Sequence, residues 1–94
     1  MSSRINVFRR KVALGHYELT GHAKSEMEQD GFTIEDIKSA IYTGRIAAVQ
    51  RHGRGRRKDV VHGKGVDGRG IRLVCRLTEL GRLRIITVFA ARTR

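Results

Sequence analysis

Four short apolar runs occupy the second half of this chain, and glycine-bearing breaks separate them. They cover residues 46–50, 59–62, 71–78 and 84–91 and are rich in Val, Ile, Leu and Phe. Runs of this length and composition, with Asp67-Gly68 and Leu80-Gly81 between the later ones, are typical of strands joined by tight turns. The pattern predicts an antiparallel meander of four strands. The last run is apolar on both faces and predicts a central strand.

The first half has the spacing of helices. Residues 4–14 place three apolar side chains on one helical face, and Tyr17 to Leu19 form a short extended link. Thr20 and Thr33 are typical N-cap residues for two further helices, the first over residues 21–30. The second helix has Asp36 at the position of a capping box and Gly44 where a C-terminal cap belongs.

Together these elements predict an α+β fold, with N-terminal helices packed on a roughly four-stranded, mainly antiparallel sheet. Ninety-four residues make one domain over residues 1–94, with residues 1–16 as a basic N-terminal helix or extension. Cys75, the single cysteine, lies in an apolar run and is expected to be a buried thiol in a cytoplasmic protein. We expect no membrane association, because no apolar stretch approaches the roughly 20 residues that cross a bilayer.

The whole net positive charge lies in the second half. Residues 1–44 carry six basic and six acidic side chains, whereas residues 45–94 carry fourteen basic and three acidic ones, which gives the full +11. Like charges repel, so an excess this concentrated predicts a polyanionic partner, with nucleic acid as the leading candidate.

Segment 51–58 is the densest part of that charge, with five basic residues in eight and two glycines. We predict a loop that clamps a phosphate backbone, and the alternative is a solvated hairpin loop. It contains no aromatic residue to stack on bases. Its basic residues are Arg51, Arg54, Arg56, Arg57 and Lys58.

Alternation within residues 71–78 places Arg72 and Arg76 on the sheet face opposite the apolar row. Two interpretations stay open, a row of phosphate contacts and a solvated face with arginine stems packed over Val74. Thr87 interrupts the most apolar strand and either supplies a hydroxyl to a site or bonds to a strand neighbour. His62 is expected to be a structural histidine.

Several sequence elements resemble a known family. They are TGHAKSEM at residues 20–27, GFTIEDI at 31–37, Gly63 followed by DGR at 67–69, and IITV at 85–88. Together they resemble a family of small bacterial proteins with a His-Ala element at the start of a helix. That family is placed near the RelE-like and MqsR-like toxins of toxin–antitoxin systems, and the resemblance covers residues 17–91.

The resemblance implies a RelE-like core over residues 17–91, and either an RNA-cleaving toxin that acts on free or ribosome-bound mRNA without metal or cofactor or a degenerate relative of one. An antitoxin protein is the implied partner. His22 is the best acid–base candidate, because an unperturbed imidazole titrates near pH 6.5, and its alternative is a structural hydrogen bond. Arg72, Arg76 and Thr87 complete the candidate catalytic set. The family often carries arginine where this chain has Glu26 and Asp30, which weakens any phosphate grip from that helix.

Two other classes of function stay open. The basic half suits a non-catalytic nucleic-acid-binding module, or a protein-interaction module that meets an acidic partner. A homodimer is one such case, because the carboxylates that cluster between Glu18 and Asp36 would then balance the basic half. The sequence contains no glycine-rich phosphate loop and no zinc-ligand spacing, so we expect no cofactor and no metal.

Overall fold

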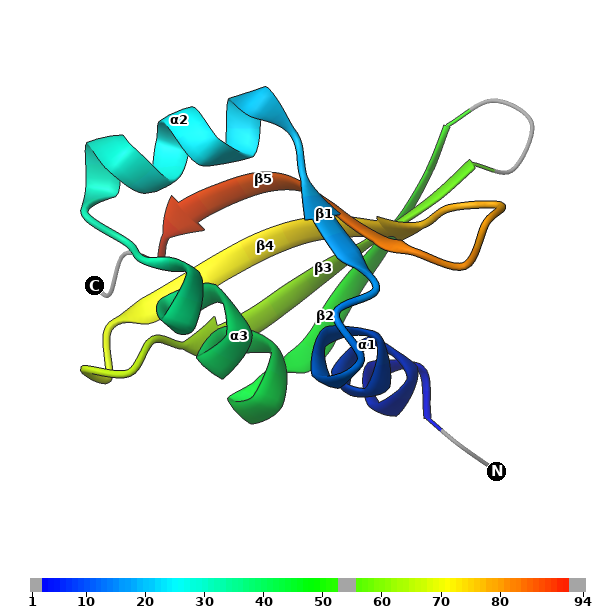
Figure 1. Cartoon of the computed structure of the whole chain (residues 1–94), viewed down its shortest axis with the longest axis horizontal. Helices are drawn as coiled ribbons and strands as arrows, with labels where there is room; N and C mark the ends of the chain where they lie inside the picture. The colour runs from blue at the N-terminus through cyan, green and yellow to red at the C-terminus, as the bar shows by residue number, and fades with distance from the viewer. Residues whose placement is uncertain (1–2, 53–55, 92–94) are drawn as a thin grey trace.

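A computed structural model of the chain describes residues 3–52 and 56–91. The α+β class predicted from the sequence is confirmed, with the helices preceding most of the sheet (Figure 1). The elements in chain order are α1 (Arg4–Ala13), β1 (Tyr17–Leu19), α2 (Gly21–Asp30), α3 (Ile34–Thr43), β2 (Arg45–His52), β3 (Arg56–Lys64), β4 (Gly70–Leu77) and β5 (Leu83–Ala90).

The five strands form a mixed sheet in the order β1-β5-β4-β3-β2. The antiparallel meander of β2 to β5 is confirmed, and β5 has a neighbour on each side. The fifth strand is new, because the predicted link over residues 17–19 pairs in parallel with β5 through Tyr17 and Leu83. Three residues are too few to show a strand alternation, so residues 17–19 were predicted as an extended link and their pairing with β5 was not.

The helix boundaries follow from their caps. The Thr20 hydroxyl accepts from the Ala23 N–H at 3.1 Å, and Thr33 and Asp36 form the predicted capping box. Gly31 ends α2 in the left-handed conformation. Gly44 ends α3 differently from the prediction, because its backbone is extended and a Cβ atom there would overlap the His62 carbonyl oxygen and the Val61 side chain of β3. Close packing of α3 on the sheet, rather than a left-handed cap, requires this glycine.

The core lies between the sheet and the helices, with α1 and α3 drawn in front of the strands in Figure 1. Alternation along β4 sends Ile71, Leu73 and Cys75 into this core. Burial raises the pKa of the Cys75 thiol to about 12, so it stays protonated at neutral pH. The fully buried side chains include Phe8, Ile37, Ile41, Val61, Leu83, Ile85 and Val88.

A bulge in β5 decides which side chains face the core. The register with β4 shifts between Val74 and Cys75, which leaves Ile86 as the extra residue. Ile85 and Val88 therefore both reach the core, and Thr87 lies opposite Val74 on the other face of the sheet.

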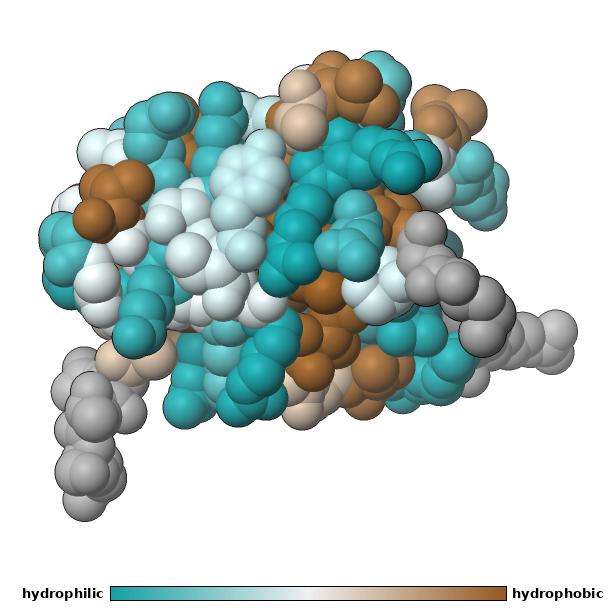
Figure 2. All heavy atoms as spheres, turned by 90° about the horizontal axis from the view of Figure 1, so that it is seen from below, coloured by the Kyte–Doolittle hydropathy of each residue, from teal (hydrophilic) through white to brown (hydrophobic). Residues whose placement is uncertain are grey.

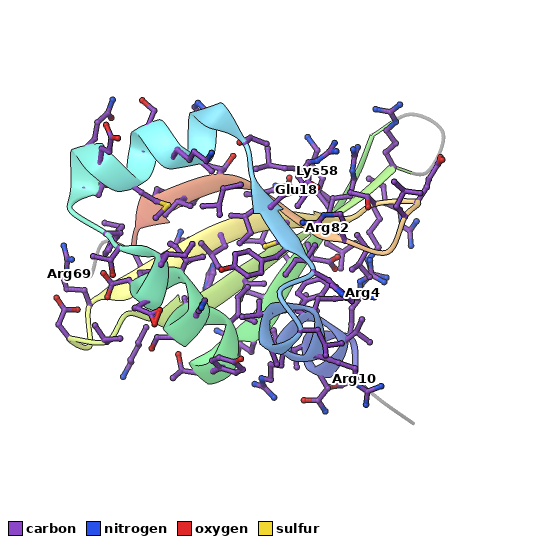
Figure 3. All side chains as sticks on the ribbon, viewed as in Figure 1. Arg4, Arg10, Glu18, Lys58, Arg69 and Arg82 are labelled. Atoms are coloured by element: carbon purple, nitrogen blue, oxygen red, sulfur yellow. The ribbon has the colours of Figure 1, made fainter. Side chains whose placement is uncertain are left out.

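The Asp67-Gly68-Arg69 turn fastens the end of α2 to the β3–β4 connection. The Arg69 guanidinium donates to the carbonyls of Asp30 and Gly31 at 3.0 and 3.1 Å, and it lies 4.4 Å from the centre of the Phe32 ring. Its Nε donates to Asp67 at 2.8 Å. Arg69 therefore has a structural role, and it lies at the opposite end of the molecule from Arg4 and Arg82 (Figure 3).

The surface seen from below is mostly hydrophilic, with apolar residues grouped in its middle (Figure 2). Within residues 3–52 and 56–91, no helix is long and apolar enough to cross a membrane. The exposed large apolar side chains are Leu14, Tyr42, Val49, Val66 and Leu80.

Candidate nucleic-acid interface

The sheet face opposite the core carries side chains in rows that run across the strands, and we call it the open face. Its first row consists of Arg45 on β2, His62 on β3, Arg72 on β4 and Phe89 on β5, each directly opposite the next. Two arginines thus flank one histidine, with an aromatic ring at the end of the row. Side chains this close across strands interact directly.

The next two rows continue the pattern toward the tips of the hairpins. The second row is mostly apolar, and its members are Ala48, Val60, Val74 and Thr87. In the third row Arg76 of β4 lies opposite Arg84 of β5, and Arg84 lies opposite Glu18 of β1. The open face is therefore an apolar band between two cationic rows.

The first row holds its histidine neutral. Burial is the main cause that lowers the pKa of His62, and the positive charges of Arg72 and Arg45 lower it further. The Nε of Arg72 is buried and has no hydrogen-bond partner among the residues that the structure describes. A guanidinium N–H left in this state costs free energy.

Beyond the open face the two hairpins separate. Pairing of β3 with β4 ends at Asp59 and Cys75, whereas β2 stays paired with β3 out to Arg56, and β4 with β5 out to Leu77. The hairpins accordingly spread apart like a fork, as the right-hand side of Figure 1 shows. We call the cavity at this end of the sheet, of about 530 Å³, the fork cleft.

Arginines from both hairpins and from α1 line the fork cleft. They come from distant parts of the chain, and Figure 3 shows Arg4 and Arg82 at this end of the molecule. Glu18 and Glu79 are the carboxylates in the lining. The lining arginines are Arg4, Arg56, Arg57, Arg76, Arg82 and Arg84.

A fully buried carboxylate holds two of these arginines in place. Asp59 accepts from the Arg4 Nε at 2.9 Å through one oxygen and from the Arg57 Nε at 3.0 Å through the other, which also forms an ion pair with the Arg57 Nη2 at 2.9 Å. The Asp59 side chain is 0% exposed, whereas those of Arg4 and Arg57 are 31% and 30% exposed. This pair of contacts ties α1 to β3 and fixes one wall of the cleft.

Glu18 holds two more arginines on the opposite side. It accepts from the Arg84 Nε at 2.8 Å and from the Arg82 Nε at 3.1 Å. These bonds, that of Arg84 above all, lower the pKa of the Glu18 carboxyl, so it is ionised at neutral pH. Arg56 and Arg76 differ, because neither makes a hydrogen bond or ion pair with any residue that the structure describes.

His22 lies away from both features. It stands in the first turn of α2, 67% exposed, with its Nε2 3.3 Å from Glu26. The same Glu26 oxygen accepts a hydrogen bond from the Val88 N–H at 2.9 Å. It thereby provides an acceptor to the part of β5 that β1 is too short to reach. Glu26 therefore has a structural role here. The catalytic role of His22 stays a prediction.

The predicted loop over residues 51–58 is shorter than expected. Residues 51 and 52 belong to β2 and residues 56–58 to β3, so Arg56 and Lys58 project from a strand. Arg56 and Arg57 line the fork cleft, and Lys58 shares the alternation of the open face. Arg51 lies opposite Arg57, on the face that bears the helices. Arg54 lies outside the described residues.

Among the other predicted residues, Arg72 and Thr87 lie on the open face, and Arg76 belongs to both the open face and the cleft. The sequence reasoning missed Arg4 and Glu18, which reach the cleft from the N-terminal half. It also missed Arg82 and Arg84, although their alternation with Leu83 and Ile85 is the signal that singled out Arg72. In the described residues, no group of three or more His, Cys, Asp or Glu side chains is placed to hold a metal ion.

The family described as "Domain of unknown function (DUF4258)" matches residues 19–90, which is most of the chain, and the chain belongs to it. The match runs from β1 into β5 and leaves α1 outside. No curated protein and no solved structure matches the chain.

Proposed function

We propose that this member of the DUF4258 family binds single-stranded RNA along its open face. The observation that carries the proposal is the first row of the open face, in which Arg72 stands between His62 and Phe89. A phosphate oxygen suits the Arg72 guanidinium, because arginine and phosphate form short, charge-assisted bonds. Arg45 lies on the other side of His62 and adds a second cation for the same backbone.

The rows of the open face match the parts of a single strand. Phosphates would follow the cationic rows, and bases would lie on the apolar band of Val60 and Val74. Phe89 stands beside Arg72 and offers a ring on which a base stacks, as aromatic residues on sheet surfaces do in other RNA-binding folds. The choice of RNA over DNA rests on the resemblance to RelE-like toxins.

The test is a binding titration with a fluorescent single-stranded RNA at several salt concentrations. Arg72→Gln removes one charge from the open face, and Arg10→Gln removes one from an exposed position on α1. We expect Arg72→Gln to weaken binding about tenfold and to reduce the slope of log K against log salt by about 0.7. Equal affinities for the two variants would overturn the proposal, and equal affinity for DNA of the same sequence would remove the RNA assignment.

A second candidate function, metal-independent RNA cleavage, is favoured by the neutral His62 between two arginines. In this mechanism the His62 ring takes the proton of a ribose 2′-hydroxyl, and the 2′-oxygen attacks phosphorus. The bond from phosphorus to the 5′-oxygen breaks, and water protonates that oxygen. The two arginines stabilise the charge that develops on the phosphate. The product strand ends in a 2′,3′-cyclic phosphate.

Incubation of end-labelled RNA with the wild type, His62→Gln and His22→Ala tests this second function and both histidines at once. We expect cyclic-phosphate products that disappear with His62→Gln and persist with His22→Ala. Loss of cleavage in the His22 variant alone would return the catalytic role to α2. Binding without products from any of the three proteins would leave a non-catalytic RNA-binding protein.

The biological role that we propose is that of a toxin, held in check by an acidic antitoxin that covers the basic surface. The resemblance to RelE-like and MqsR-like proteins supports this role, together with the concentration of arginines on one face and one cleft. Induced expression in bacteria is expected to slow growth and protein synthesis, and the Arg72→Gln protein to do so less. Unchanged growth with abundant folded protein would overturn it.

A further inference from the structure

We propose that the fork cleft binds the terminal phosphate of an RNA strand and so makes the protein prefer phosphate-ended RNA. The proposal rests on RNA binding at the open face and adds an end-recognition site to it. The cleft volume of about 530 Å³ falls within the range of small-ligand sites. Its lining is dominated by arginine, whose planar fork matches phosphate oxygens.

The charge of the cleft suits a phosphate monoester. The lining contains six arginines and two carboxylates, Glu18 and Glu79, and the buried Asp59 pairs with two of the arginines. Together these groups carry a net charge of +3. A terminal phosphate carries a charge of about −1.5 to −2 at neutral pH, whereas each internal diester carries −1. A strand end therefore neutralises more of this charge than an internal phosphate does.

The arrangement of donors also favours an end group. Arg56 comes from the β2–β3 hairpin and Arg76 from the β4–β5 hairpin, so cations belong to both arms of the fork. Neither is engaged by another described residue, and Arg84 directs only its Nε to Glu18. Three terminal oxygens accept bonds from more directions than the two free oxygens of a diester.

The position of the cleft makes it an end point for a strand on the open face. Arg76 and Arg84 belong both to the third row of the open face and to the lining of the cleft. Just beyond that row β3 and β4 no longer pair, so the flat surface stops. A chain that follows the apolar band toward the hairpin tips meets the cleft where the sheet ends.

Three RNA oligomers of one sequence test the proposal, with a 5′-phosphate, a 3′-phosphate, or hydroxyls at both ends. They are titrated against the wild type, Arg56→Gln, Arg72→Gln and Arg10→Gln. We expect the wild type to bind one phosphate-ended oligomer about tenfold more tightly than the hydroxyl-ended one. Arg56→Gln should lose this preference and Arg10→Gln should keep it. Arg72→Gln should weaken all three oligomers by the same factor.

The outcomes separate the cleft from the open face. Equal wild-type affinity for all three oligomers would overturn the cleft site while leaving RNA binding intact. A phosphate preference that survives Arg56→Gln in a folded protein would equally overturn it. Failure of the wild type to bind any oligomer would overturn the proposed function itself. A preference for either end supports the site and identifies which terminus it takes.

Discussion

Replacing Asp59 with Asn is predicted to destabilise the fold strongly, although the two side chains have nearly the same shape. The carboxylate is 0% exposed, accepts a charge-assisted hydrogen bond from each of Arg4 and Arg57, and forms an ion pair with both. An amide keeps one acceptor and turns two N–H donors toward a guanidinium, so at least one arginine loses its partner. The variant therefore leaves an arginine unpaired beside a buried amide.

The size of the effect follows from that burial. Breaking one side of a buried ion pair costs about 3 to 5 kcal/mol. Arg4 and Arg57 are 31% and 30% exposed and can turn toward water, which places the expected loss near the lower end, about 3 kcal/mol. At about 0.05 to 0.15 kcal/mol per residue, this is a large part of the total stability of the domain. The melting temperature should fall by about 15 °C.

Urea unfolding followed by circular dichroism measures the loss, with Glu35→Gln as the matched control. Glu35 is a 63% exposed carboxylate on α3 whose removal should leave stability unchanged. In an Arg4→Gln background the Asp59→Asn replacement should cost less, because part of the interaction is already absent. An Asp59→Asn protein as stable as Glu35→Gln would refute the reasoning. In the folded fraction, the freed arginines should strengthen binding of phosphate-ended RNA.

Three further changes test the packing and the titrating groups. Gly63→Ala should destabilise by about 3 kcal/mol, because a Cβ atom would overlap the Ala40 backbone, whereas Gly21→Ala meets nothing within 4 Å and should be neutral; urea midpoints compare them. Asp36→Asn should cost about 2 kcal/mol at pH 7, because it weakens the α3 cap. Hydrogen bonds from the backbone of Thr33 and Val66 lower the pKa of the Asp36 carboxyl from 3.8, so this difference should begin to shrink near pH 4 and disappear as the pH falls through the lowered pKa. The pKa of His62 is also lowered, so wild-type stability should fall as the pH drops below about 6.5, and His62→Gln should remove that fall; a variant that keeps the wild-type pH profile would contradict it.

Local chemistry made much of the fold predictable. Thr20 and Thr33 cap helices because their hydroxyls accept from backbone N–H groups three residues on, a contact that needs no tertiary partner. The alternation of Arg72 with Ile71 and Leu73 predicted both faces of β4. The parallel pairing of β1 could not be predicted in this way, because its only signal is a partner 66 residues away. A pairing with a distant strand produces no recognisable pattern within a segment of three residues.

The fork cleft was less accessible to sequence reasoning than the open face. Segment 51–58 drew attention through local charge density. Its described residues, however, belong to two paired strands, and successive side chains along each strand point to opposite faces of the sheet. Arg4 joins Arg57 only because Asp59 is buried between α1 and β3. A lone acidic residue among five basic neighbours in the sequence would have been the signal for such a contact.

The folded structure concentrates the surplus charge instead of spreading it. Asp59, Asp67 and Glu18 neutralise arginines whose task is to hold helices and hairpins together. Arg56, Arg72 and Arg76 have no such partner among the described residues, and all three lie on the open face or in the fork cleft, whereas Arg10 and Arg51, which also lack a carboxylate partner there, lie elsewhere. A phosphate backbone bound to the open face and the cleft would relieve the repulsion among the cations of those two surfaces. Bound RNA should consequently raise the free energy of unfolding, by an amount that grows with ligand concentration and shrinks with salt.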